Sequence, residues 1–397
     1  MLITADRVLT GSGTYLEDGA VLVDGDRITA VGPRAQFAGH SRALGAELSF
    51  PGATVMPGLI DAHVHLVFDG SADPLATFNA SSDEQLLRDM RRRAEQLLSS
   101  GVTTVRDLGD RNGLALRLQE EISRGGTPGP RIVSAGTPAT TPGGHCHFLG
   151  GEVGGEAAIR DLVRRNLAAG AGVIKVMASG GGLTKDGPPS WQSQFSADEL
   201  RTLVEEAHQA GAPVAAHAHG ADSIAAVVDA GVDTIEHCTW MTKDAFGLRQ
   251  DVLKKIIERG IAVCPAVSPH WQMVARHFGE ERTKVLFGQV RQMAEAGVRL
   301  IAGTDAGVQR TGFENSLAGA LPFYAHVGMP TDRILDMVTA HAADALGLGG
   351  SVGRIKSGLR ADLVVVDGNP LADLGALREI RAVITAGCVK DPGSSAE

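Results

Sequence analysis

The chain has 397 residues, of which 43% are hydrophobic and 4% aromatic, and its formal net charge is −9. This length exceeds the roughly 250–300 residues at which one hydrophobic core stops growing, so we expect a large domain and a smaller one. The acidic balance argues against nucleic acid and anionic membranes as partners, and a small-molecule substrate is the expected ligand.

Signals for export or membrane insertion are weak. Residues 1–6 lack the basic and then apolar order of a signal peptide, and no window approaches the ~18 uninterrupted apolar residues of a membrane span. The four cysteines show no Cys-x-x-Cys spacing, which is typical of reduced thiols, so we expect a cytoplasmic protein. The basic run Arg91, Arg92 and Arg93 lies in a polar helical pattern and is expected to form a solvated helix face.

Both ends of the chain read as short strands. Residues 21–32 form a hairpin pattern with Asp24 and Gly25 at the turn, and residues 361–368 and 380–387 are also strand-like. We therefore predict that residues 1–56 and 351–397 combine into one small β-sandwich domain, with residues 391–397 as a frayed tail.

Between these ends, short apolar runs alternate with amphipathic stretches. One such stretch spans residues 196–209, where Ser196 and Glu199 have the spacing of a capping box. The eight apolar runs are 59–64, 103–106, 131–135, 173–178, 213–217, 234–237, 262–266 and 300–304. Eight alternations predict a (β/α)8 TIM barrel over residues 57–350. An open doubly wound sheet is the alternative, but no Gly-x-Gly-x-x-Gly follows the first strand, and Gly180–Gly182 lacks the remainder of a phosphate loop.

Polar residues gather at the predicted carboxyl ends of these strands, where barrel enzymes place their active sites. His63 and His65 are two residues apart on a strand, so their imidazoles point to the same side, as a divalent metal requires. A lysine inside an apolar strand is costly unless it is paired or modified. Each such residue alone is compatible with a structural role, but together they predict a metal site. The full set is His63, His65, Lys175, His217, His219, His237 and Asp305.

The residue types, their order and their strand positions resemble the amidohydrolase superfamily across essentially the whole chain. Within it, the prolidase-like or imidazolonepropionase-like branch is the most similar. The segments that resemble this branch are 143–145, 175–181 and 217–220, and segment 358–365 matches the β-domain of the superfamily. Two segments depart from the branch pattern, namely 311–315 and 339–341.

The resemblance implies a binuclear zinc centre. Lys175 would be carboxylated and bridge the two ions, and Asp305 would be both a ligand and the general base. His63 and His65 would bind one ion with Asp305, His217 and His237 would bind the other, and His145 and His219 would contact the substrate. The implied reaction is metal-dependent hydrolysis of an amide bond, in a dipeptide or an N-acyl amino acid, by a protein that could form a homo-oligomer.

Other functions stay open at this point. The same centre could hydrolyse a urea, a carbamate, a lactone or a cyclic amide. A mononuclear deaminase is disfavoured, because such relatives generally lack the lysine ligand and commonly carry Glu where Gly220 stands. A non-enzymatic scaffold is disfavoured because all six ligand positions are filled. His147, His270 and Arg310 have only their position to suggest a role at the site.

Overall fold

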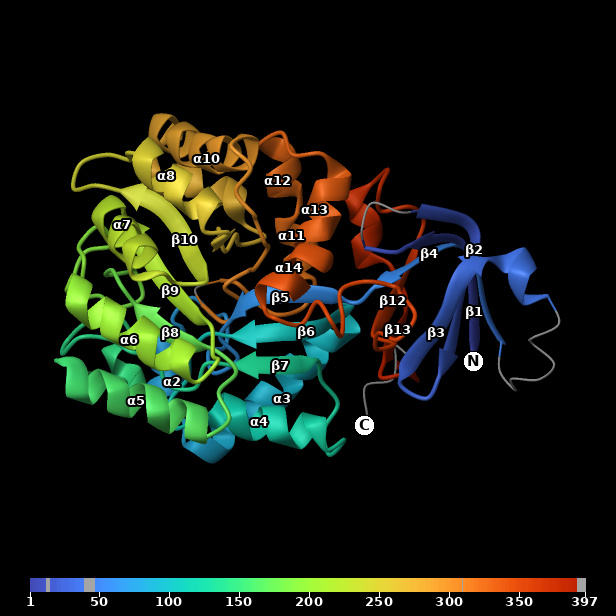
Figure 1. Cartoon of the computed structure of the whole chain (residues 1–397), viewed down its shortest axis with the longest axis horizontal. Coiled ribbons are helices and arrows are strands. Elements are labelled where there is room, and N and C mark those ends of the chain that lie inside the picture. Colours follow the sequence, from blue (N-terminus) through green and yellow to red (C-terminus); the bar gives the residue numbers. More distant parts are fainter. Residues whose placement is uncertain (12–14, 39–46, 309, 391–397) are drawn as a thin grey trace.

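The computed structural model describes residues 1–11, 15–38, 47–308 and 310–390. Strands from both ends of the chain form one seven-stranded sheet, which lies at one end of the molecule (Figure 1). Its order is β14-β13-β12-β4-β1-β2-β3. The strands are β1 (Leu2–Leu9), β2 (Tyr15–Asp24), β3 (Arg27–Pro33), β4 (Glu47–Pro57), β12 (Leu363–Asp367), β13 (Ile380–Thr385) and β14 (Cys388–Lys390).

The predicted pairing of the two chain ends is therefore correct, but the sandwich is not observed. All seven strands join one hydrogen-bonded sheet, in which β12 pairs with β4 as its direct neighbour, and among the described residues this sheet is not divided into two separate sheets. The hairpin β2–β3 has its turn at Gly25, as predicted, with Asp24 paired to Arg27. The predicted frayed tail, residues 391–397, lies outside the described residues.

The larger part of the chain contains two parallel sheets. The three-stranded sheet has the order β5-β6-β7 and the four-stranded sheet the order β11-β10-β9-β8. Their strands are β5 (Leu59–Val64), β6 (Val102–Asp107), β7 (Arg131–Ser134), β8 (Ile174–Met177), β9 (Val214–Gly220), β10 (Thr234–Met241) and β11 (Ala262–Cys264). Seven of the eight predicted runs are thus strands.

The eighth run, residues 300–304, is extended chain without an assigned strand. Single bridges join Leu300 to Val263 and Ala306 to Val64, and another joins Ala139 to Val176 between the two sheets. The run still bonds to both neighbours, since the N–H of Ile301 donates to Val263 and the N–H of Ala62 donates to Ala302. The N–H of Ala302, however, donates to the carbonyl of Met337, 3.1 Å away, and not to a neighbouring strand. The described residues therefore form two parallel sheets linked by bridges, and the assigned strands do not close into one barrel.

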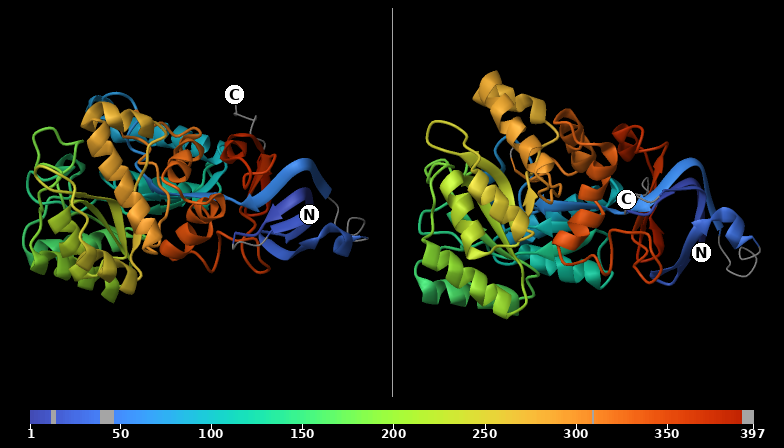
Figure 2. Two further views of the ribbon diagram at one scale, coloured as in Figure 1. Left: turned by 90° about the horizontal axis from the view of Figure 1, so that it is seen from above. Right: turned by 45° about the horizontal axis from the view of Figure 1, so that its top comes forward.

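Helices cover the outside of these sheets (Figures 1 and 2). They are α2 (Pro74–Ala80), α3 (Asp83–Ser99), α4 (Leu114–Ser123), α5 (Glu156–Ala168), α6 (Ala197–Gln209), α7 (Ala221–Ala230), α8 (Gln250–Glu258), α9 (Val274–Phe278), α10 (Glu280–Glu295), α11 (Ser316–Ala320), α12 (Pro322–His326), α13 (Thr331–Met337) and α14 (Ala340–Ala345). The predicted capping box of α6 is present, since Ser196 and Glu199 each accept a hydrogen bond from the other's backbone N–H.

The basic run on α3 is not a solvated face throughout. Arg92 is exposed, but Arg93 is buried, and its Nη1 donates to the carbonyl of Leu66 at 2.8 Å. Arg91 forms two hydrogen bonds of 2.8 Å to Glu121 on α4. Arg93 thus ties α3 to the segment that directly follows His65.

None of the helices in the described part of the chain combines the length and the apolar character needed to cross a membrane.

Candidate metal centre

A cavity of about 200 Å³ opens at the carboxyl ends of β5, β8, β9 and β10. All eight residues that the sequence analysis assigned to the site line this cavity. Its walls are His63, His65, Phe68, His145, Cys146, Lys175, Met177, Gly182, Leu183, His217, His219, His237, Asp305 and Val308. Histidines dominate the polar part of the lining, so the cavity offers neutral nitrogen ligands together with one carboxylate.

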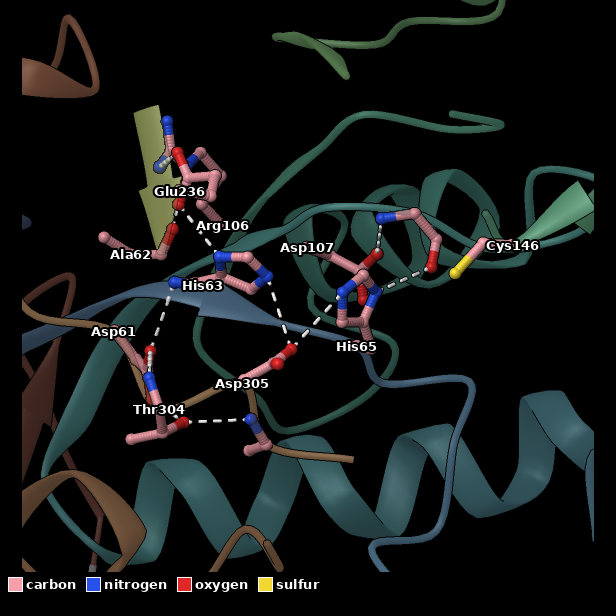
Figure 3. Close-up of polar contacts among 12 residues, drawn as sticks. Asp61, Ala62, His63, His65, Arg106, Asp107, Cys146, Glu236, Thr304 and Asp305 are labelled. Atoms are coloured by element: carbon pink, nitrogen blue, oxygen red, sulfur yellow. Dashed lines mark hydrogen bonds and ion pairs between the residues drawn. The ribbon is translucent and has the colours of Figure 1, made fainter. Parts of the chain in front are cut away.

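His63 and His65 both face Asp305 (Figure 3). The Nε2 atoms of the two imidazoles lie 3.3 Å and 3.5 Å from Oδ1 of Asp305. Burial opposes ionisation of Asp305, but His63, His65 and Lys175 outweigh it and lower the pKa of this carboxyl, which stays ionised. Burial lowers the pKa of His65 to about 4, so this imidazole is neutral and able to bind a metal.

A buried carboxylate that the sequence analysis did not assign holds the other side of His63. Oε2 of Glu236 lies 2.8 Å from Nδ1 of His63, while Oε1 accepts hydrogen bonds of 2.7 Å from Arg106 and from Thr234. Burial would raise the pKa of Glu236, but Arg106 and His63 outweigh it and lower the pKa to about 2. An ionised acceptor at Nδ1 keeps a proton on that nitrogen, so Nε2, on the side of Asp305, is the nitrogen that would bind a metal ion. Burial opposes protonation of His63, but Asp305 and Glu236 outweigh it and raise its pKa.

Three histidines form a second cluster. Their potential ligand atoms lie within 4.8 Å of one another in the group His217, His219 and His237. The rings of His219 and His237 are stacked, with centroids 4.6 Å apart. Nε2 of His217 lies 3.0 Å from the carbonyl of Gly180, so its Nδ1 is the nitrogen left to bind a metal ion. Nδ1 of His219 lies 3.0 Å from Oγ1 of Thr239, so its Nε2 is left for the same purpose. The geometry therefore brings His219 together with His217 and does not favour one of them.

Lys175 lies on β8 and lines the same cavity as the group of His63, His65 and Asp305 and the cluster of three histidines. Its side chain is 1% exposed, and its Nζ has no hydrogen-bond partner among the described residues. Burial lowers the pKa of this amine to about 8, against the opposing effect of Glu236 and Asp305. An unpartnered buried ammonium is costly, whereas the uncharged amine is the form that carbon dioxide converts to a carbamate.

The remaining candidates divide into two groups. His145 is 6% exposed and its ring centroid lies 4.7 Å from that of His217. Burial lowers the pKa of His145 to about 3, so its imidazole is neutral. His147, His270 and Arg310 do not line the cavity; His270 borders a separate pocket and Arg310 is exposed.

Two of the candidate ligands have a strained backbone. His237 and Asp305 have φ values of 67° and 58°, in the left-handed region that costs non-glycine residues energy. Asp305 is held there by its backbone, because its N–H donates to the carbonyl of His63 at 2.8 Å. Gly303 makes room for this approach, since a Cβ at Gly303 would lie 2.6 Å from Cβ of His63.

Sequence reasoning missed Glu236, Arg106 and the apolar wall formed by Phe68 and Leu183. Glu236 lies inside a predicted apolar strand and Arg106 at the end of another. Because burying an unpaired charge is costly, two opposite charges in such strands could have indicated a buried ion pair. The loop residues carried no such signal.

Comparisons with known proteins agree with this geometry. The profile of the Amidohydrolase family matches residues 54–391, and a bacterial imidazolonepropionase-like composite domain profile matches residues 19–38. Ochratoxinase of Aspergillus niger is 28% identical over 428 aligned positions, which cover 96% of this chain and 84% of that protein. Imidazolonepropionase of Streptomyces griseus is 26% identical, covering 92% of this chain and 90% of that protein.

Solved structures agree as well. The crystal structure of A. niger ochratoxinase has a TM-score of 0.87 at 25% identity, over 99% of this chain and 96% of that chain. A Xaa-Pro dipeptidase with methionine bound in its active site also has a TM-score of 0.87, at 28% identity over 98% of this chain and 99% of that chain.

Proposed function

The chain belongs to the amidohydrolase family and is a hydrolase of carbon–nitrogen bonds. We propose that it uses two divalent metal ions, most simply zinc, to hydrolyse the amide bond of a dipeptide or an N-acyl amino acid. The proposal of two metal ions rests mainly on the surroundings of Lys175. Its unpartnered Nζ lines the same cavity as five other metal-binding side chains. A carboxylated Lys175 would supply two oxygens where the free amine supplies no anionic ligand.

Two overlapping groups of potential ligands, which share His237, support the proposal of two neighbouring ions. His63, His237 and Asp305 form one group of potential ligands within 4.8 Å, and His217, His219 and His237 form another. We assign His63, His65 and Asp305 to one ion and His217 and His237 to the second, with carboxylated Lys175 between them. His219 then remains available to contact the substrate together with His145.

When bound, such ions polarise a carbonyl oxygen and lower the pKa of a water molecule. The protein supplies the proton transfers. Asp305 stays ionised because His63 and His65 lower its pKa, so it can accept a proton from the attacking water. The same carboxyl then delivers the proton to the leaving amine. Glu236 holds His63 in the tautomer that this arrangement requires.

The substrate class is supported by the cavity wall and by relatives. Phe68, Met177, Leu183 and Val308 form an apolar surface beside the polar groups. Phe68 is fixed from behind by Phe78, with ring centroids 5.4 Å apart. Ochratoxinase and a Xaa-Pro dipeptidase are both similar to this chain. An amide with an apolar group on one side of the scissile bond fits this wall.

The test combines metal analysis with a substrate panel. We expect about two metal ions per chain in protein produced with zinc and bicarbonate, and hydrolysis of dipeptides or N-acyl amino acids. His270→Ala, outside the cavity, is the matched control for variants of the six ligands. One ion per chain with unmodified Lys175 would refute the binuclear centre. Hydrolysis confined to ureas, carbamates, lactones or cyclic amides would refute the substrate class, and deamination or no turnover would refute the reaction.

We also propose that the two parallel sheets act as one (β/α)8 barrel over residues 57–350, with residues 1–56 and 351–397 as the second domain. The bridges at Leu300 and Ala306 support closure on one side, and the bridge at Ala139 supports it on the other. Slow amide exchange at Ala62 and Asp305, whose N–H groups cross the junction, would test this arrangement.

A further inference from the structure

Thr184 connects two loops at the cavity. It follows β8, and its Oγ1 accepts a hydrogen bond of 2.8 Å from the N–H of Cys146, in the loop that follows β7. The same Oγ1 lies 3.2 Å from Nδ1 of His145. Neither the ligand set nor the substrate contacts proposed above include Thr184.

The hydrogen bonds around this hydroxyl favour one tautomer of His145. A threonine hydroxyl has one hydrogen to donate. Oγ1 accepts a hydrogen bond from the N–H of Cys146, and the strongest acceptor beside its own hydrogen is Nδ1 of the neutral His145 imidazole. The Cys146 thiol also faces Thr184, but a thiol sulfur is a weak acceptor. His145 then carries its proton on Nε2.

Other contacts fix the ring. One of them involves Nε2 of His145, which lies 3.5 Å from Sγ of Cys146, a weak acceptor that a substrate oxygen would replace as the partner of the Nε2 proton. The N–H of His145 donates to Gln194 at 2.7 Å, and the imidazole lies against His217. Gly181 leaves space for the ring edge, because a Cβ there would lie 2.4 Å from Nε2 of His145. A change at Thr184 therefore alters the proton position while these packing contacts persist.

We propose that Thr184 is a positioning residue that holds His145 in the Nε2-protonated tautomer, so that His145 donates a hydrogen bond to an oxygen of the bound substrate; the second part rests on the proposed function. An amide substrate carries carbonyl oxygens, which can only accept. The opposite tautomer would present a lone pair to those oxygens and repel them.

The tautomer is tested by nitrogen NMR of zinc-loaded protein labelled with 15N-histidine. His145→Gln identifies the signals of His145 by their loss. We expect a protonated Nε2 in the wild type and in Thr184→Ser, which keeps the hydroxyl. Thr184→Val, which has the same shape without it, should show a mixed or reversed tautomer. A wild type protonated on Nδ1, or a Thr184→Val spectrum unchanged at His145, overturns the proposal.

The substrate contact is tested with N-acetyl-L-phenylalanine as the probe. Thr184→Val should lower kcat/KM about 3- to 10-fold, the range expected for one neutral hydrogen bond, with zinc content unchanged. Thr184→Ser should stay within about 2-fold of the wild type on the same scale. A changed tautomer with unchanged kcat/KM overturns the contact alone. A wild type inactive on amides refutes the proposed function, while the NMR result still decides the role of Thr184.

Discussion

The substitution Glu236→Gln tests two roles of Glu236: it is the charge partner of Arg106, and it orients the proton of His63. The substitution preserves shape but removes the negative charge between Arg106 and His63. If the amide oxygen keeps its bonds to Arg106 and Thr234, the amide nitrogen faces Nδ1 of His63. Nδ1 must then accept a hydrogen bond, so the proton of His63 moves to Nε2. The nitrogen that faces Asp305 can no longer bind a metal ion.

The magnitudes follow from burial. Glu236 and Arg106 are 0% and 2% exposed, so the variant leaves a buried guanidinium without its charge partner. Breaking a buried ion pair in this way costs about 3–5 kcal/mol of stability. Loss of the partner that orients a metal-binding histidine lowers metal affinity roughly 10- to 100-fold. The pKa of Glu236 is lowered to about 2, so its contribution is fully present above its ordinary value of 4.5 and is lost only as the pH falls toward 2.

Urea unfolding of chelator-treated protein at pH 7 measures the loss of folding free energy. Competition for zinc with a chromophoric chelator measures the loss of metal affinity. Thr234→Val is the matched control, since it keeps the charge pair of Glu236 and Arg106. It removes the hydrogen bond that Thr234 donates to Glu236 and the one it accepts from Arg106, and should cost about 1.5–3 kcal/mol. Adding Arg106→Met to Glu236→Gln should restore stability but leave zinc affinity low. Wild-type zinc affinity in Glu236→Gln would refute the claim that Glu236 sets the tautomer of His63.

Four further outcomes are expected. Lys175→Ala should lose metal and activity together, measured by elemental analysis and turnover; retention of two ions would exclude Lys175 as the bridge. Asp305→Asn should lower kcat by about 100-fold or more while some metal remains, and unchanged kcat would exclude Asp305 as the base. Gly303→Ala should destabilise the fold by about 1–3 kcal/mol, because its Cβ meets His63, whereas Gly312→Ala, with open space around it, should be neutral in the same urea titration. Chelation should lower stability by about 2.7 kcal/mol relative to protein in zinc at 100 times its Kd, and an unchanged midpoint of unfolding would exclude a site that binds only the folded state.

Local rules predicted most of the elements. The capping box at Ser196 and the turn at Gly25 depend on residues a few positions apart, and both are present. Alternating apolar runs located seven strands of the two parallel sheets. The eighth run has no assigned strand, and the N–H of Ala302 donates to Met337, a contact that no local pattern encodes. The same limit applies to the small domain, since the pairing of β12 with β4 joins residues more than 300 positions apart and makes one sheet of both chain ends.

The sequence predicted those residues of the candidate site that lie at the ends of strands. Alternation along the first run predicted that His63 and His65 face one side; in the structure β5 ends at Val64, and both imidazoles face Asp305. The family resemblance is confirmed. The same alternation could not separate His217 from His219, because both lie on one face of β9. Glu236 contacts partners 173 and 130 positions away, so its role depends on tertiary structure. Arg93 was misread for a similar reason, since its partner Leu66 lies on another element.

The left-handed backbone of His237 and Asp305 costs folding free energy, and for Asp305 the contacts that meet this cost lie within the protein. Each such residue costs about 1–3 kcal/mol, and it persists only where its surroundings enforce it. For Asp305 the enforcing contacts are backbone hydrogen bonds to the first strand: its own N–H to His63, and the N–H of His65 to Ala306. Thr304 adds a 2.7 Å hydrogen bond to the buried Asp61, which also accepts from the N–H of His63. Because these contacts need no metal ion, the protein rather than the ion sets the spacing of His63, His65 and Asp305. The strain is therefore met by the fold, and metal binding energy is not consumed in assembling this half of the site.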